Sequence, residues 1–306
     1  MKSLVGQIIN NHLAPYMNRW ELAFIDEKVE DVVGGRPIHI TKIHNPYFKE
    51  YWFADPFILD VDDNNVYVLA EAMPLKQLHK GEIALLTISM EMNAINRVEI
   101  VLAEPWHLSF PNIMRKDGKI FVYPESLNSG KLYRYELIKD NQGNHALKRV
   151  DILCNAIVWD SEISDVFGEE ILFTCKQDDF HLDIYRWDKR QGVFLYSESI
   201  KSNQQNMRMA GALFKIDDKV YCPSQISTPT IYGKAVEIKE LSYADGKWQY
   251  APIRRIDHPQ EYLLTGLHTF NTYKGVTIID FHYHNYTYEK IVSKLVAIKR
   301  WIKGKE

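Results

Sequence analysis

The stretch DPFILDVDDNNVYVLAE, residues 55–71, reads as two short strands joined by a tight turn. The residues before the turn are mostly apolar, Asp and Asn form the turn, and VYVLAE alternates with period two. The same unit recurs at four later places in the chain: FPNIMRKDGKIFVYPE (110–125), SEISDVFGEEILFTC (161–175), AGALFKIDDKVYCPSQ (210–225) and TFNTYKGVTIIDFHYH (269–284). The chain is therefore predicted to repeat one β-hairpin unit.

The spacing of these hairpins identifies the architecture. The apolar residues just before each turn are Ile58, Ile113, Ile163, Leu213 and Phe270, which lie 55, 50, 50 and 57 positions apart. A four-stranded propeller blade takes roughly 40 to 50 residues, and radial repetition of blades leaves few exposed strand edges. The sequence therefore predicts an all-β fold, a five-bladed β-propeller.

We expect the chain, residues 1–306, to form a single propeller domain, since no linker-like stretch divides it. Residues 1–50 would form an N-terminal segment that closes the ring against the last blade. The expected blades cover roughly residues 51–104, 105–154, 155–204, 205–258 and 259–300.

The repeat also predicts where a binding site lies. The first strand of a blade lines the central channel, and the antiparallel second strand returns to the end at which the first began. Residues that open first strands and residues that close second strands therefore share one end of the channel, which we call the funnel. The first strands are expected near residues 54–60, 110–115, 160–166, 209–215 and 267–273.

Composition narrows the classes of partner. The 37 Lys and Arg nearly balance the 40 Asp and Glu, so the net charge is only −3. A nucleic-acid partner is not expected. The chain also has no apolar run of the roughly 20 residues that a membrane-spanning helix needs. The 18 Tyr, 13 Phe and 7 Trp suit sheet packing and equally suit stacking on sugar rings.

The cysteines and the first residues of the chain indicate the cellular compartment in which we expect the protein. Cys154, Cys175 and Cys222 are too few and too scattered for a disulfide framework and form no zinc motif. The first residues, MKSLVGQIINNH, break their apolar run early and do not resemble a signal peptide. We therefore expect a cytoplasmic protein with free thiols.

Several short motifs, in order along nearly the whole chain, carry a family resemblance. They are FADPF (53–57), AEAM (70–73), HLSFPNI (107–113), YPES (123–126), KLYRY (131–135), MRMAG (207–211), YGKAVEIKEL (232–241) and GLHTFN (266–271). The chain resembles the propeller domain at the N-terminus of glucosamine inositolphosphorylceramide transferases and beside bacterial sugar formyltransferases. More distantly, it resembles glycoside hydrolase family 43.

The family 43 resemblance implies an inverting glycosidase, in which one carboxylate activates water and another protonates the leaving oxygen. Asp55 matches the general base. The general acid falls near Asp160 or Glu162, and Glu125 is a further candidate for it. The family's pKa-tuning Asp falls at Phe110, which puts hydrolysis in doubt.

The remaining candidates are residues that would bind substrate, and each also has a purely structural interpretation. Glu71 either accepts hydrogen bonds from sugar hydroxyls or pairs with Arg208, and His107 either contacts ligand or holds its loop. Trp52 suits ring stacking and blade packing equally. The substrate-binding candidates are Trp52, Glu71, His107, Arg208, Gln225, His268 and His282.

We expect no cofactor and no metal centre at His282 and His284, since no third ligand has metal-like spacing. The match of Gly266-Leu267-His268 to family 43 implies a structural calcium or water near His268, although this side chain could equally hydrogen-bond in the core.

Two functions remain open on the sequence alone. One is a glycosidase-like activity on a sugar conjugate. The other is a non-catalytic carbohydrate-recognition domain that assists a glycosyltransferase or sugar-modifying enzyme of surface polysaccharide synthesis.

Overall fold

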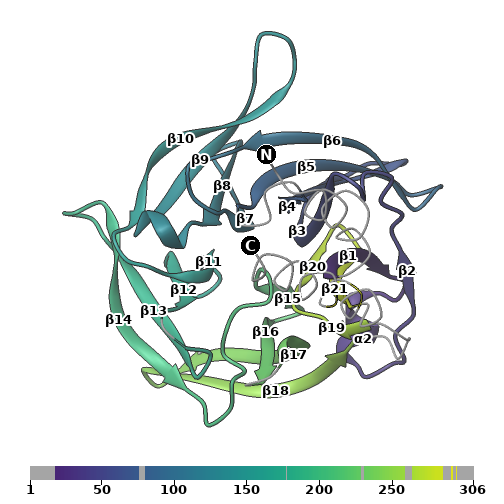
Figure 1. Ribbon diagram of the computed structural model, residues 1–306. Helices are drawn as coiled ribbons and strands as arrows, with labels where there is room; N and C mark the ends of the chain where they lie inside the picture. Colours follow the sequence, from purple (N-terminus) through teal and green to yellow (C-terminus); the bar gives the residue numbers. More distant parts are fainter. Residues whose placement is uncertain are drawn as a thin grey trace, which may run out of the picture.

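The computed structural model describes residues 18–75, 80–176, 178–228, 231–258, 264–284, 291 and 294. Five antiparallel sheets stand in a ring around a central axis, which confirms the five-bladed β-propeller (Figure 1). A short helix, α2 (Val29–Val33), and a single 3₁₀ turn, η3 (Leu127–Ser129), interrupt the strands.

Four sheets are each built from four consecutive strands. The first contains β3 (Tyr51–Val61), β4 (Asn65–Pro74), β5 (Glu82–Ser89) and β6 (Ala94–Leu102). The second contains β7 (Ser109–Lys116), β8 (Lys119–Glu125), β9 (Leu132–Lys139) and β10 (His145–Cys154). The third contains β11 (Trp159–Ser164), β12 (Ile171–Cys175), β13 (His181–Asp188) and β14 (Val193–Lys201). The fourth contains β15 (Phe214–Ile216), β16 (Lys219–Thr228), β17 (Ile231–Ala244) and β18 (Lys247–Asp257).

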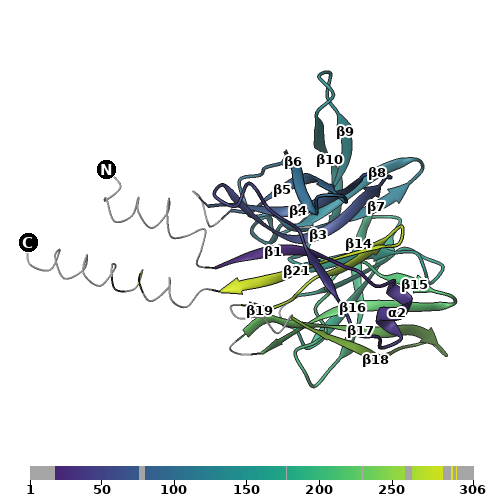
Figure 2. The same cartoon turned by 90° about the vertical axis from the view of Figure 1, so that its right-hand side faces the viewer.

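The fifth sheet joins the two ends of the described chain. It contains β19 (Leu264–Gly266), β20 (Phe270–Tyr273), β21 (Val276–His284), β1 (Asn18–Ile25) and β2 (Ile40–Lys42). β1 pairs with β21 along its whole length, from Asn18 opposite His284 to Ile25 opposite Thr277, and the two strands lie side by side in Figure 2. The N-terminal strands thus cover the edge that β21 would otherwise expose.

This closure is stabilised by apolar packing as well as by backbone hydrogen bonds. Leu22 on β1 is 3% exposed and packs in a core cluster with Ile278 of β21 and Val68 of β4. The cluster therefore connects the first blade to the last. Other buried apolar clusters lie between the remaining neighbouring blades.

We predict that Leu22→Ala lowers the free energy of unfolding by about 2 to 4 kcal/mol, because the cavity would open at the closing strand. Chemical denaturation monitored by tryptophan fluorescence measures this. Val150→Ala is the control, since Val150 is 47% exposed on β10, and it should change stability by less than about 0.5 kcal/mol. Equal stabilities for Leu22→Ala and the control would contradict this account of closure.

The first strands of the first three blades lie where the sequence predicted them, but those of the fourth and fifth blades are interrupted, with only an isolated bridge at Met209 before β15 and with β19 before β20. β15 starts at Phe214 rather than near residue 209, and β20 starts at Phe270 rather than near residue 267. The reason is a hydrogen bond between the two blades, in which the Phe270 N–H donates to the Ala210 carbonyl at 2.7 Å. Gly211 permits this approach, because a Cβ there would lie 2.1 Å from the Phe270 carbonyl oxygen.

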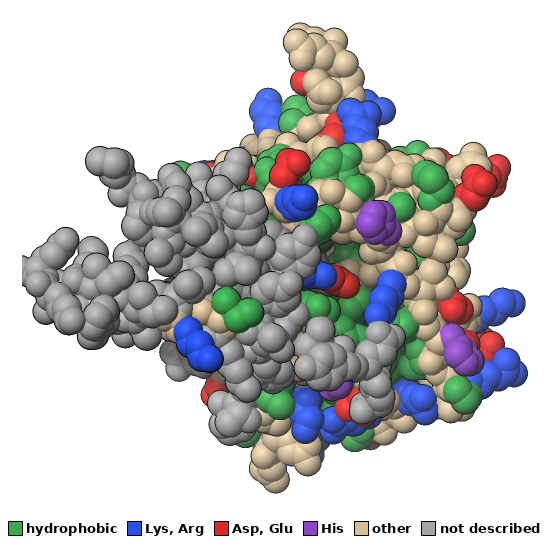
Figure 3. Space-filling model, turned by 45° about the vertical axis from the view of Figure 1, so that its right-hand side comes forward, with side chains coloured by type: hydrophobic (Ala, Val, Ile, Leu, Met, Phe, Trp, Pro, Cys, Tyr) green, Lys and Arg blue, Asp and Glu red, His purple; other side chains and the backbone are tan. Residues whose placement is uncertain are grey.

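The charge of the surface and the length of the helices indicate which classes of partner fit the protein. On the face drawn in Figure 3, acidic and basic side chains are interspersed and form no single charged patch. Among the described residues, no helix has the length and apolar character required to cross a membrane. All three cysteines are free and buried.

Candidate functional site

The same backbone irregularity opens the first strand of each of the first three blades. The pairing register shifts between Ala54 and Phe57, between Ser109 and Asn112, and between Trp159 and Glu162. Inside these bulges Asp55, Phe110 and Asp160 have φ angles of 49°, 45° and 40°. A positive φ is uncommon for residues other than glycine, and bulges beside active sites often re-aim a side chain.

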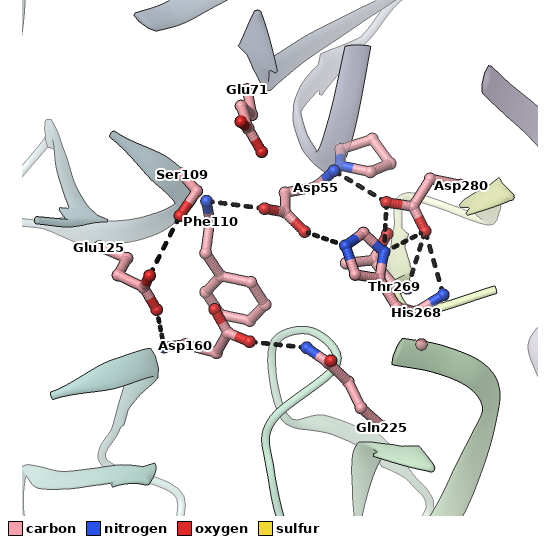
Figure 4. Close-up of polar contacts among 12 residues, drawn as sticks. Asp55, Glu71, Ser109, Phe110, Glu125, Asp160, Gln225, His268, Thr269 and Asp280 are labelled. Carbon is pink, nitrogen blue, oxygen red and sulfur yellow. Dashed lines mark hydrogen bonds and ion pairs between the residues drawn. The ribbon is translucent and has the colours of Figure 1, made fainter. Parts of the chain in front are cut away.

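The second strands deliver further polar side chains to the same end of the channel. Glu71 pairs with Ala54, and Glu125 pairs with Ser109, so each carboxylate lies beside the bulge of its own blade. Figure 4 shows Asp55, Glu71, Glu125 and Asp160 facing a common centre from three blades. We call these four residues together with Asp280 the carboxyl cluster.

Asp160 is held by an ion pair and by two further hydrogen bonds. Its carboxylate accepts hydrogen bonds from Arg208 Nε at 2.5 Å and from Gln225 Nε2 at 2.6 Å. Its own N–H donates to Glu125 Oε2 at 2.8 Å, and Arg208 also approaches Glu125 at 3.7 Å. Arg208 therefore compensates the charge of Asp160, which makes Asp160 a weak candidate for a general acid.

Asp280 is a site residue that the sequence analysis missed. It is fully buried and accepts hydrogen bonds from the main-chain N–H groups of Asp55 and Thr269, both at 2.9 Å, and from His268 Nδ1 at 2.8 Å. Burial opposes ionisation of Asp280, but the charge of His268 and the hydrogen bonds from His268, Asp55 and Thr269 together lower the pKa of Asp280. The sequence feature that could have identified Asp280 is its position as a single carboxylate within the otherwise apolar run TIIDF.

His268 bridges two carboxylates. Its Nε2 lies 3.5 Å from Asp55 Oδ1, while Nδ1 bonds to Asp280 (Figure 4). Burial favours the neutral ring, yet Asp280 and Asp55 together raise the pKa of His268. His268 therefore lies between two carboxyl groups, and its contact with Asp280 favours the protonated ring.

Asp55 lies beside this ion pair. Its Oδ2 accepts a hydrogen bond from the Phe110 N–H at 3.1 Å. Burial raises the pKa of Asp55 well above its ordinary value, and Glu71, Asp160 and Asp280 add to this. Phe110 itself is fully buried, with its ring edge-on to Phe57 at 4.8 Å, so that position contributes a backbone donor and no carboxylate.

The cluster has more acids than bases. Its five carboxyl groups face two cations, Arg208 and His268, which pair with Asp160 and Asp280. Burial, reinforced by Glu125, raises the pKa of Glu71 well above its ordinary value. Burial and the adjacent Asp160 raise the pKa of Glu125 to about 8. Protons are therefore retained on the surplus carboxyl groups at neutral pH, where they can both donate and accept hydrogen bonds.

Glu71 has a defined neighbour in His107. The Gly81 N–H donates to His107 Nδ1 at 2.8 Å, and His107 Nε2 lies 3.5 Å from Glu71 Oε1. Burial lowers the pKa of His107, which favours a neutral ring with its proton on Nε2. A Cβ on Gly81 would lie 2.5 Å from the Leu108 carbonyl oxygen, so only glycine permits this arrangement.

Glu162 belongs to a separate network. It bonds to Asn112 Nδ2 at 2.5 Å, to the Leu213 N–H at 3.3 Å and to the Tyr123 hydroxyl at 3.4 Å. Burial raises its pKa to about 8. These partners tie together the second, third and fourth blades, and they differ from the partners of Glu125 and Asp160.

Two other candidates lie at the margin of the site. Trp52 is partly buried on β3 opposite Met73. His282 pairs with Trp20 across β21 and β1, and its Nδ1 lies 2.7 Å from the Thr265 hydroxyl.

Asp55, His268 and Asp280 form a group of metal-ligating side chains whose ligand atoms all lie within 4.8 Å of one another. Calcium takes six to eight oxygen ligands. The two carboxylates supply too few oxygens, and both ring nitrogens of His268 already face them. These residues satisfy one another as an ion pair and do not fit a calcium ion held directly by the protein.

The fold and the site thus define a five-bladed propeller with a buried carboxyl cluster at one end of its channel. A family profile described as glucosamine inositolphosphorylceramide transferase 1, N-terminal, matches residues 35–255. The chain belongs to this family. No curated protein matches the chain.

Solved structures agree on the fold. An exo-β-1,3-galactanase from Phanerochaete chrysosporium, solved with β-1,3-galactotriose, aligns with a TM-score of 0.50 and 11% identity over 74% of this chain and 59% of that chain. A glycoside hydrolase family 43 enzyme from Xanthomonas citri aligns at 0.48 and 12% over 76% and 87%. A β-xylosidase/α-arabinofuranosidase from a compost microbial metagenome, solved with xylotriose, aligns at 0.47 and 13% over 74% and 83%. At 11% identity, the likeness to the galactanase shows the fold alone.

Proposed function

We propose that the funnel binds the sugar part of a sugar conjugate through its carboxyl cluster. The observation that carries this proposal is a set of three buried carboxyl groups with raised pKa values, those of Asp55, Glu71 and Glu125, which face a common centre (Figure 4). Protonated carboxyl groups both donate and accept hydrogen bonds, which matches the hydroxyl groups of a sugar. The exo-β-1,3-galactanase, which was solved with β-1,3-galactotriose, supports the same class of ligand.

Hydrolysis is the second candidate function. The observation that favours it is that the pKa of Glu125, raised to about 8, keeps a proton on this residue at neutral pH, as a general acid requires. Asp55 would then activate the water molecule. Two features disfavour this role: the raised pKa of Asp55, which weakens a base, and the missing carboxylate at Phe110. We therefore favour sugar recognition over hydrolysis as the function of the site.

The biological setting follows from the family. Its name describes a glycosyl transfer, which supports a role in assisting a glycosyltransferase or sugar-modifying enzyme, including those of surface polysaccharide synthesis. The three buried free thiols suit a reducing compartment, so we propose a cytoplasmic location.

A glycan array followed by calorimetry tests the proposal. We expect the wild-type protein to bind a defined group of glycans and Asp55→Asn to weaken that binding about twofold to tenfold, since the amide NH₂ can only donate where the protonated carboxyl OH both donates and accepts. Asp257→Asn, at an exposed aspartate paired with Arg255, is the matched control and should bind as the wild type does. Binding that is equal in all three proteins would show that the sugar lies elsewhere.

The same variants separate recognition from hydrolysis. If the protein is a hydrolase, Asp55→Asn abolishes release of reducing sugar while the bound glycan is retained. If it is a recognition domain, neither protein releases sugar from the glycans that the array identifies. Turnover that survives in Asp55→Asn would contradict the assignment of Asp55 as the base.

A further inference from the structure

A cavity separate from the carboxyl cluster, called here the second cavity, lies between the fourth and fifth blades. Its volume is about 440 Å³, and its walls include Trp20 of β1, Tyr232 of β17, and Thr265 and His282 of the fifth blade. This volume lies in the range of small-molecule sites. The cavity was not anticipated from the sequence, because its walls come from segments more than 200 residues apart.

An aromatic stack connects the cavity to the cluster. The Trp20 ring lies parallel to the His268 ring, with 3.8 Å between centroids, and His268 faces Asp55. Tyr232 stands edge-on to both rings, 5.5 Å from His268 and 6.5 Å from Trp20. Trp20 and Tyr232 therefore mark the boundary between the cluster and the second cavity.

Two glycines set the position of Tyr232. Gly233 has a φ of +58°, and a Cβ on it would lie 2.7 Å from His268 Cβ. A Cβ on Gly266 would lie 2.4 Å from the Gly233 carbonyl oxygen, which accepts a hydrogen bond from the Leu267 N–H at 2.7 Å. The backbones of the two blades touch here, so the Tyr232 ring is held by a contact that only glycine permits.

The chemistry of the walls indicates an uncharged ligand. The described residues that line the cavity include no Lys, Arg, Asp or Glu. Burial, together with His284, lowers the pKa of His282 to about 4, so His282 is neutral at pH 7. Tyr232 remains 50% exposed, while Thr265 and His282 supply polar groups at the edge. Aromatic faces beside hydrogen-bonding groups suit a sugar ring better than a phosphate or an acyl chain.

We infer that this cavity is a second subsite, which binds an uncharged sugar ring linked to the one held by the carboxyl cluster. The inference rests on the proposed function. It makes Tyr232 and Trp20 residues that recognise the neighbouring sugar, and it implies that the natural ligand has at least two sugar rings.

The test compares methyl monosaccharides with the corresponding disaccharides of the glycan best bound on the array, by calorimetry at pH 7. We expect the wild-type protein to bind the disaccharide about tenfold more tightly than the monosaccharide. Tyr232→Ala should lose about fivefold to twentyfold in disaccharide affinity and less than twofold in monosaccharide affinity, since stacking on its ring is lost.

Tyr243→Ala is the matched control, because Tyr243 lies on the same strand, is 44% exposed and packs against Trp248 away from the cavity. It should leave both affinities unchanged. Trp20→Phe keeps an aromatic ring on β1 and should weaken the binding of the disaccharide but not of the monosaccharide. This second variant keeps the test decisive if Tyr232→Ala does not fold.

Two failures are distinguishable. If the disaccharide gains no affinity over the monosaccharide, or if Tyr232→Ala weakens both equally, the second subsite is wrong while the carboxyl cluster still binds sugar. If no glycan on the array binds the wild-type protein, the proposed function falls and the subsite falls with it.

Discussion

Asp280→Ala is expected to lower the free energy of unfolding by about 3 to 5 kcal/mol, the largest effect we predict for a single substitution. Asp280 is fully buried, and its carboxylate accepts hydrogen bonds from the main chain at Asp55 and Thr269 as well as from His268. Removal of the carboxylate leaves three buried main-chain N–H groups without their acceptor and takes from His268 its closest carboxylate partner.

Urea denaturation at pH 7 measures this loss, with Asp257→Ala as the control at an exposed carboxylate of the same propeller. NMR titration of His268 gives an independent readout, because the pKa of His268 should fall once Asp280 no longer raises it. A loss of less than about 1 kcal/mol with an unchanged titration of His268 would show that the two residues are not an ion pair.

Most substitutions of buried residues lower the free energy of unfolding. Glu125→Gln is expected to raise it relative to the wild type at high pH. Glu125 has its pKa raised from 4.5 to about 8, first by burial and then by Asp160. At pH values between 4.5 and about 8, Glu125 is protonated in the folded protein and ionised in the unfolded chain. The contribution of Glu125 to stability therefore falls as pH rises through this window and stays low above it.

Gln has the shape of the protonated acid and cannot ionise, so the variant should escape this loss. We expect the difference in unfolding free energy, variant minus wild type, to shift in favour of the variant by about 2 to 4 kcal/mol between pH 5 and pH 9. Denaturation curves across this range measure the shift. Glu240→Gln, at a surface pair with Lys219, should show none. Parallel curves for wild type and Glu125→Gln would mean that Glu125 is ionised throughout.

Much of the fold could be predicted because each hairpin is specified locally. Alternation with period two and turn residues lie within about 20 positions of one another, and the spacing of hairpins near 50 residues is that of propeller blades. The direction of the strands predicts which strand ends lie at the same end of the propeller. For this reason the sequence could predict that Asp55, Glu71, Glu125 and Asp160 lie together.

What could not be predicted depends on contacts between blades. Asp280 binds the backbone of Asp55, which lies 225 positions earlier, and only closure of the ring brings them together. Trp20 and Tyr232 border the cluster for the same reason, since β1 pairs with β21 and Gly233 touches Gly266. The late starts of β15 and β20 likewise reflect the hydrogen bond between Phe270 and Ala210. None of these contacts has a signal within a single hairpin.

The central claim is that the carboxyl cluster binds sugar, and the most direct test is a crystal structure of the protein with the glycan that binds best on the array. The account predicts a sugar ring in the funnel with hydroxyl groups within hydrogen-bond distance of Glu71, Glu125 and Asp55, and a second ring beside Tyr232. A glycan bound on the outer face of a blade, with the carboxyl cluster untouched, would contradict it.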